Sequence, residues 1–116
     1  MLSNTNTKKI IIRKIKLADT PFQQGLGLMF SRKKNFNYAL IFSRPNESIV
    51  GSSIHMMFVF YKIKVIFLDK DKKVVDIIKS AKPFWFYAPK KPSKYIIELP
   101  LNTYIDNIKI NHKLNW

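Results

Sequence analysis

The clearest fold signal in this sequence is the stretch Ile63-Lys64-Val65-Ile66-Phe67-Leu68-Asp69-Lys70-Asp71-Lys72-Lys73-Val74-Val75-Asp76-Ile77-Ile78. Two apolar runs, at 63–68 and 73–80, flank the polar residues 69–72. Aspartate at a break between two apolar runs is typical of a hairpin turn. We therefore predict a β-hairpin whose second arm exposes Lys73, Asp76 and Lys79.

Other apolar runs on either side of this hairpin have the length of strands. Residues 43–48 contain Arg-Pro-Asn-Glu, which is turn chemistry. Residues 83–92 include three prolines, and proline lacks the N–H that a central strand must donate, so no regular strand is expected there. The further predicted strands are 8–17, 38–42, 54–60, 95–99 and 108–114.

A capping box begins at Thr20, with proline at the first helical position and Gln23 three residues after the cap. It predicts a short helix over about 21–28, and Thr103 predicts a single helical turn to about Asn107. The expected fold class is mostly β (α+β by count): a compact single-domain β-sandwich or small barrel with these two helical pieces. Residues 1–7 are expected to be a flexible polar terminus, and 8–116 the domain.

The composition excludes several classes of protein. The chain has no cysteine, which excludes disulfides, thiolate catalysis and cysteine metal sites. No apolar run approaches the ~18–20 residues of a membrane span, and residues 1–12 contain no signal-peptide core. We therefore expect a soluble cytoplasmic protein with no membrane partner.

The formal net charge of +14 invites a nucleic-acid interpretation. Of the 21 basic residues, however, 18 are Lys and three are Arg, although Arg is the better match for phosphates and guanine edges. The lysines are scattered along the chain, and 16 Ile and 9 Asn accompany them, as an AT-rich genome would encode. A solvated surface is therefore favoured over a nucleic-acid footprint.

Several stretches keep a common order over residues 17–114: Ala18-Asp19-Thr20, then Gln24 or Gln23, Gly27-Leu28-Met29-Phe30 with Arg32, 54–60, 63–69, Val74-Val75, Lys82-Pro83, 95–100, and Ile108-Lys109-Ile110 with Leu114. In these stretches the chain resembles the family called domain of unknown function 192 (DUF 192). The resemblance implies a compact, mostly β domain with a short early helix. It implies no reaction, because the family has no established biochemical activity.

Three positions depart from the family pattern in the same way. Asn102, Asn107 and Asn111 stand where the family usually has glycine. Asparagine is the other residue type that best tolerates a positive φ angle. We therefore expect left-handed turns at these three positions.

Few residues could carry catalysis, and we assign no catalytic, cofactor-binding or metal-binding residue. Asp69 and Asp71 have the ordinary places of aspartates in a hairpin turn. Alternation along 95–99 turns Glu98 outward, which favours a surface ion pair over a functional carboxylate. His55 lies in an apolar segment, and His112 is the only other imidazole, so a histidine metal site is not favoured.

One segment interleaves aromatic rings with lysines, as single-stranded nucleic-acid sites do. A lid over the core is the competing interpretation of the same rings. A second candidate surface follows the family motif around the predicted helix. The candidate binding residues are Phe84, Trp85, Phe86, Tyr87, Lys82, Lys90 and Lys91 on the first surface, and Gln23, Met29, Arg32 and Met56 on the second.

The sequence therefore favours a non-catalytic binding or accessory module with an unknown ligand. Single-stranded nucleic-acid binding through the lysine-flanked aromatics is one alternative. A small hydrolase or lyase using Asp69, Glu98 or His112 is another, and enzymatic activity is the less favoured class. A nucleic acid and a small molecule both stay open as partners, as do the monomer and the homodimer.

Overall fold

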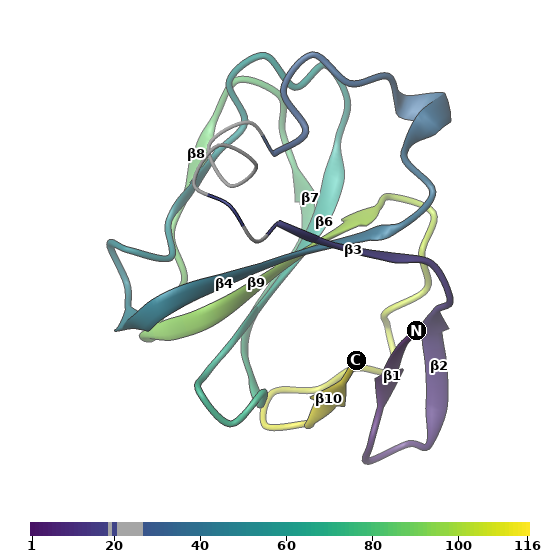
Figure 1. Cartoon of the computed structure of the whole chain (residues 1–116), viewed down its shortest axis with the longest axis vertical. Coiled ribbons are helices and arrows are strands. Elements are labelled where there is room, and N and C mark those ends of the chain that lie inside the picture. The colour runs from purple at the N-terminus through teal and green to yellow at the C-terminus, as the bar shows by residue number, and fades with distance from the viewer. Residues whose placement is uncertain (19, 21–26) are drawn as a thin grey trace.

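A computed structural model describes residues 1–18, 20 and 27–116 of the chain. The described residues form strands joined by turns and one short 3-10 helix, η1 (Lys33–Asn35). The strands form sheets of five, three and two strands (Figure 1). The strands are β1 (Leu2–Asn4), β2 (Lys9–Ile12), β3 (Ile15–Ala18), β4 (Ala39–Ser48), β5 (Ile54–His55), β6 (Ile63–Leu68), β7 (Val74–Ala81), β8 (Phe86–Tyr87), β9 (Ser93–Pro100) and β10 (Leu114–Asn115).

The five-stranded sheet has the order β3-β4-β9-β6-β7 and is the centre of the molecule. β3 runs parallel to β4, and the other neighbours are antiparallel. The predicted hairpin is confirmed as β6 and β7, and the predicted strand at 95–99 is confirmed as part of β9. β3 and β7 remain at the two edges, so within the described residues the sheet does not close into a barrel.

Both faces of the central sheet are buried, because its middle strands are apolar at consecutive positions. Val65, Phe67 and Ile96 belong to a core on one face. Ile66, Leu68 and Ile97 belong to a second core on the other face. A side chain on the middle strand β9 therefore meets protein on either side, whichever way it points.

The N-terminal residues take part in the second core, although the sequence led us to expect a flexible polar terminus there. β1 pairs with β2 and with β10, so the two ends of the chain lie side by side (Figure 1). Leu2 is 0% exposed and lies in the core with Leu114. The buried Leu2 and the pairing with β2 and β10 hold this strand on the domain.

Several predicted elements differ from the structure. The predicted helix falls mostly on 21–26, which lie outside the described residues, and 27–30 form a turn. Residues 103–107 make bends and turns in place of a helical turn. The predicted strand at 108–114 is likewise wrong, because residues 110 and 111 form a turn, Lys113 makes only an isolated bridge to Lys73, and β10 begins at Leu114 and contains two residues.

Two segments have a different secondary structure from the predicted one, and the errors are opposite in kind. Residues 43–48 were predicted as a turn, yet they extend β4, with Ser43 paired to Tyr95 and Ser48 to Ser93. An irregularity between these pairs accommodates Pro45, as a bulge does. Conversely, the predicted strand at 54–60 ends after His55, because Val59 N–H bonds to the Met56 carbonyl in a tight turn (3.2 Å).

Asp76 is also placed differently from its prediction. It is buried, with one carboxylate oxygen accepting the N–H of Ile77 (2.8 Å) and the other accepting the N–H of Lys90 (3.0 Å). The carboxylate therefore ties the proline-rich segment 82–92 to β7.

Within the described part of the chain, no helix is long and apolar enough to cross a membrane.

Candidate functional site

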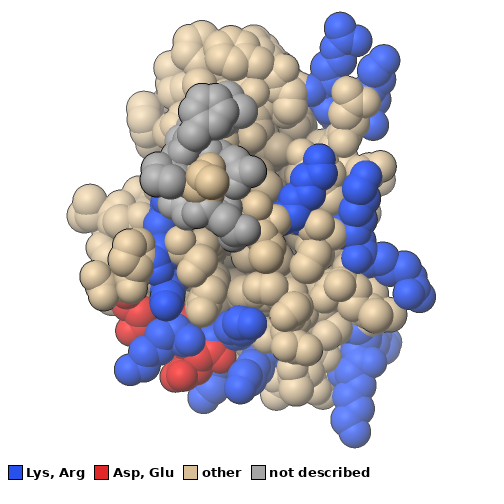
Figure 2. All heavy atoms as spheres, in the orientation of Figure 1, with Lys and Arg blue, Asp and Glu red and all other residues tan. Residues whose placement is uncertain are grey.

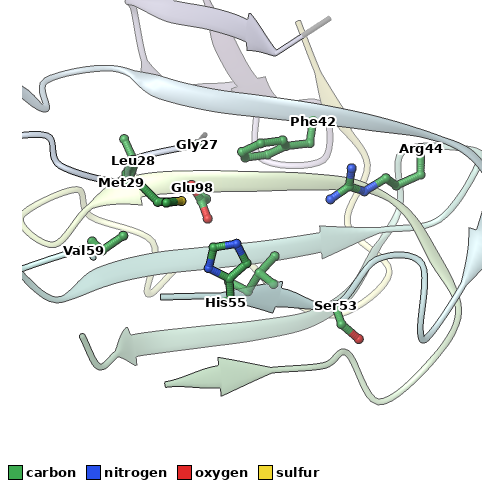
Figure 3. Close-up of a pocket in the computed structure, with 10 residues that line it drawn as sticks. Gly27, Leu28, Met29, Phe42, Arg44, Ser53, His55, Val59 and Glu98 are labelled. Atoms are coloured by element: carbon green, nitrogen blue, oxygen red, sulfur yellow. The ribbon is translucent and has the colours of Figure 1, made fainter. Parts of the chain in front are cut away.

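A cavity of about 50 Å³ opens over the middle of the central sheet, on the face of the first core. A single bound water needs about 10–15 Å³ of such space, so the cavity accommodates several waters or one small polar group. Figure 3 shows side chains from the sheet, from β5 and from two turns around it. The described lining residues are Gly27, Leu28, Met29, Phe42, Arg44, Ser53, Ile54, His55, Val59 and Glu98.

Glu98 is the carboxyl group of this cavity, and its position corrects the sequence prediction. It was expected to face solvent beside a basic residue, but it is 5% exposed, because β9 lies between β4 and β6. No described residue makes a hydrogen bond or a close ion pair with its carboxyl group. A buried polar group in this state leaves its hydrogen-bonding capacity for a ligand or water.

Burial also changes the protonation of Glu98. Removal from water raises the pKa of this carboxyl group to about 8, and the positive charge of Arg44 opposes the rise without cancelling it. At neutral pH the group is therefore mostly the uncharged acid. In that form it donates one hydrogen bond and still accepts others.

Two further side chains bring N–H donors to the cavity. Arg44 projects from β4, and its guanidinium points along the sheet toward the space beside Glu98 (Figure 3). A guanidinium has five N–H donors, so it can hold contacts within the protein and still donate to a ligand. His55 accepts the N–H of Met57 at Nδ1 (3.3 Å), which leaves Nε2 as the protonated nitrogen of the neutral ring.

Two turns complete the wall opposite the sheet. The turn at 27–30 contributes Leu28 and Met29, and the turn at 56–59 contributes Val59. The N–H of Phe30 bonds to the carbonyl of Phe58 (2.8 Å), which holds the turns together. Gly27 has a φ of 50° and lies against the Phe42 ring, so a side chain there would be strained.

The second predicted surface is partly brought together at this cavity. Met29 lines it, whereas Met56 is buried beneath it in the first core. Arg32 is exposed next to η1. Gln23 lies outside the described residues. Arg44 and Glu98 were missed as a pair because they are far apart in sequence and meet only through the pairing of β4 with β9.

The predicted aromatic surface is arranged as an exposed segment with one anchored ring. Phe84, Trp85 and Phe86 are exposed, while Tyr87 is half-buried and its hydroxyl accepts the N–H of Lys82 (2.7 Å). The backbone of the segment is bonded to Met56, through Met56 N–H to the Trp85 carbonyl and Phe84 N–H to the Met56 carbonyl (both 2.7 Å). Lys82, Lys90 and Lys91 are all exposed.

The three residues of the hydrolase alternative have separate surroundings. Asp69 accepts the N–H groups of Asp71 and Lys73 in the hairpin turn (both 2.9 Å). His112 contacts Asn4 beside β1, at 3.0 Å. Neither residue lines the cavity that contains Glu98. The described residues contain no group of three or more His, Asp or Glu side chains that could hold a metal ion.

The left-handed turns expected from asparagine are confirmed at one position. Asn111 has a φ of 73°, whereas Asn102 and Asn107 have negative φ angles, so the expectation is wrong there.

A second, shallower cavity of about 360 Å³ lies near η1, between Lys33, Tyr61 and Leu101. It has no buried charged group, unlike the cavity of Glu98.

The fold and the cavity define a small, mostly β protein whose central sheet buries the Glu98 carboxyl group at a cavity that Arg44 and His55 also line. The chain belongs to the family DUF192, described as "Uncharacterized ACR, COG1430", whose model matches residues 2–116. This match confirms the resemblance seen in the sequence.

The chain is similar to UPF0127 proteins of archaea. It is 44% identical to one from Thermococcus sibiricus over 118 residues, which cover all of this chain and 74% of the relative. It is 38% identical to one from Pyrococcus furiosus over 117 residues, covering all of this chain and 97% of the relative. The names of these relatives assign no activity.

Two solved structures share the fold. A protein of unknown function from Novosphingobium aromaticivorans superposes with a TM-score of 0.73 at 24% identity, over 88% of this chain and 74% of that one. A putative transcription regulator from Sinorhizobium meliloti superposes with a TM-score of 0.75 at 20% identity, over 87% of this chain and 79% of that one. At these identities the similarity concerns the fold alone.

Proposed function

We propose that this protein is a non-catalytic binding module that holds the carboxylate group of a small ligand in the cavity beside Glu98. The observation that carries the proposal is the buried Glu98 carboxyl group, which has no hydrogen-bond partner among the described residues and faces an open space between Arg44 and His55. Three groups that can donate hydrogen bonds surround this space, and a carboxylate is an acceptor with two oxygens.

The charges at the cavity favour an anion over a cation. With Glu98 as the neutral acid, Arg44 is the charged group that a ligand meets there. A cation would have to displace the Glu98 proton and also approach the guanidinium, which costs free energy. An anion instead gains a charge-assisted bond to Arg44 and accepts the Glu98 proton in a hydrogen bond.

This arrangement supports binding better than catalysis. Acid–base catalysis requires partner groups within hydrogen-bond reach of the reacting atoms. Glu98 has no second carboxyl group among the described lining residues, and Asp69 and His112 lie elsewhere. The size of the cavity suits the end group of a ligand, with the rest of the ligand outside its mouth.

The test is an NMR titration of the folded protein with acetate and, separately, with methylammonium. Acetate should shift the amide signals of Leu28, Met29 and His55. Its affinity should be nearly constant from about pH 6 to 7, where acetate is ionised and Glu98 is mostly protonated, and should fall about tenfold per pH unit above pH 8, as Glu98 loses its proton and repels the anion. Shifts caused by methylammonium, with none by acetate, would show a cation site and refute the proposal.

Two variants separate this site from general attraction to a basic protein. Glu98→Gln retains a donor of similar shape, so it should keep acetate binding and lose the decline above pH 8. Arg44→Gln should weaken binding about tenfold or more, because a charge-assisted hydrogen bond is lost. Arg13→Gln removes an exposed arginine away from the cavity lining and should change nothing. Equal losses for both arginine variants would contradict the assignment.

A further inference from the structure

Four phenylalanine rings pack against one another on the surface, and we call them the aromatic cap: Phe30, Phe58, Phe60 and Phe84. Phe30 stacks on Phe58 with ring centroids 4.9 Å apart, and Phe84 meets both Phe58 (5.9 Å) and Phe60 (5.3 Å) edge-on. All four remain substantially exposed, Phe30 at 64% and Phe60 at 61%. Trp85 and Phe86, which follow in the chain, are exposed as well. A contiguous exposed apolar patch of this kind marks an interaction surface.

The backbone beneath the cap is strained in a way that presents the rings outward. Phe30, Phe58 and Phe84 have φ angles of 62°, 58° and 57°. This left-handed region is unfavourable for bulky residues and is enriched at functional sites. Met29 and Val59 line the cavity, and the left-handed conformation of the adjacent phenylalanine in each turn accompanies a ring that faces solvent.

The three turns that carry the cap are bonded to one another, so the cap is a preorganised surface. Phe30 N–H bonds to the Phe58 carbonyl (2.8 Å), and Phe84 N–H bonds to the Met56 carbonyl (2.7 Å). The rings therefore keep their positions without a partner. Binding to such a surface avoids the entropy cost of ordering loops.

The charged residues in the segments that carry the cap are all basic. The segments 27–36, 56–62 and 82–86 contain no acidic residue. In the view of Figure 2 the upper left of the molecule, near β8, shows no charged group, whereas lysines and arginines stand at the upper right and along the right-hand edge. The cations in the three segments, all exposed, are Arg32, Lys33, Lys34, Lys62 and Lys82.

We propose that the aromatic cap docks on the surface of an anionic phospholipid bilayer, with its rings in the headgroup boundary and the flanking cations on the lipid phosphates and carboxylates. Aromatic side chains partition into this boundary, and each lysine or arginine near an anionic leaflet adds electrostatic attraction. The protein would lie on the membrane without a spanning segment, so the proposal replaces the expectation from composition that a membrane is not a partner. This inference is independent of the proposed carboxylate site.

The arrangement of the rings favours a bilayer over the two other occupants of such a surface. Bases of single-stranded nucleic acid need free ring faces. In the cap, Phe30 and Phe58 cover one face of each other, and Phe84 is held edge-on between its neighbours. A second copy of this chain would bring the same cations face to face. A bilayer needs only exposed apolar groups with cations in the same segments.

The test is sedimentation of the full chain with phosphatidylcholine vesicles, prepared with and without phosphatidylserine. Phe60→Ser and Phe30→Asn, which keeps a residue tolerant of positive φ, should each reduce partitioning about tenfold on the serine-containing vesicles. Tyr104→Ser is the matched control, because Tyr104 is 65% exposed and lines a different surface depression, next to Asn4 and Ile10. Circular dichroism shows whether each variant is folded, and any unfolded variant is replaced by Phe86→Ser.

Four results would overturn the proposal. The first is the absence of binding to serine-containing vesicles at low salt. The second is binding that both phenylalanine variants leave unchanged, which would assign it to diffuse charge. The third is binding of a single-stranded oligonucleotide that Phe60→Ser weakens while vesicles do not bind, which would make the cap a nucleic-acid platform. The fourth is a dimer in solution that Phe60→Ser dissociates.

Discussion

The buried carboxyl group of Glu98 should make the stability of this protein fall as the pH rises from 4.5 to 8. The pKa of Glu98 is raised from 4.5 to about 8 in the folded protein. Below pH 4.5 the group is protonated in both states and has no effect. Between the two values the folded protein keeps a proton that the unfolded chain has lost, so unfolding becomes easier with each pH unit. Above pH 8 the effect stays constant.

The size of the effect follows from the two pKa values. Each pH unit inside the window lowers the free energy of unfolding by about 1.4 kcal/mol. At pH 7 the expected loss is therefore about 3 kcal/mol, which is a large share of the ~5–15 kcal/mol of a typical domain. Glu98→Gln has nearly the same shape and no ionisation. It should match the original protein at pH 4.5 and be about 3 kcal/mol more stable at pH 7.

Urea unfolding followed by tryptophan fluorescence measures this difference, because Trp116 packs on Tyr95 in the folded protein (5.2 Å between ring centroids). The quantity to compare is the difference in the free energy of unfolding between the two proteins at each pH, because the contributions of all other titratable groups are the same in both. Glu47→Gln is the matched control, because Glu47 is exposed and its removal should leave the original pH dependence. If the free energy of unfolding of Glu98→Gln and that of the original protein change in parallel from pH 5 to 8, the reasoning is refuted.

Two further predictions concern the ends of the chain. Leu2→Ala should lower the free energy of unfolding by about 2–5 kcal/mol, because Leu2 is fully buried; a change below ~0.5 kcal/mol in urea unfolding would show a loose terminus instead. Asn111→Ala should be about 1–2 kcal/mol less stable than Asn111→Gly in thermal unfolding, because φ is 73° there, and equal stabilities would mean that this turn relaxes.

The central hairpin could be predicted because its signal is local. The apolar runs of β6 and β7 and the aspartate turn between them lie within one short stretch, and Asp69 accepts the turn N–H groups as such a residue should. The strand at β9 could be found in the same way. The order of the strands in the sheet could not be predicted, since alternation in one strand does not show which strands lie beside it or whether a second layer covers its polar face.

That missing information explains the error at Glu98. Alternation correctly separates Glu98 from Ile97 and Leu99, which lie in the second core. The interpretation that the opposite face is exposed to solvent was wrong. Leu40 and Val65 flank Glu98 on the neighbouring strands, and the first core covers that face. Burial of a carboxyl group depends on sheet order, and sheet order is set by contacts between distant segments.

The aromatic cap was predictable only in part, for the same reason. The segment 84–87 stands out in the sequence, but Phe30, Phe58 and Phe60 are separated from it by up to about half of the chain. They meet because the turns at 27–30, 56–59 and 83–86 are bonded at one place. Nothing in the local sequence of Phe30 or Phe58 indicates a positive φ, which asparagine or glycine would have indicated.

The same two turns build the cavity on their inner side and the aromatic cap on their outer side. Met29 and Val59 point inward, and their neighbours Phe30 and Phe58 point outward and stack. The strain at these phenylalanines is therefore the cost of placing apolar groups on both sides of a thin wall. Glycine at position 58 would relieve that strain but would remove the ring that holds Phe30 and Phe84 together. Both turns contribute residues to the cavity and to the cap. A movement of either turn would therefore change the shape of both surfaces.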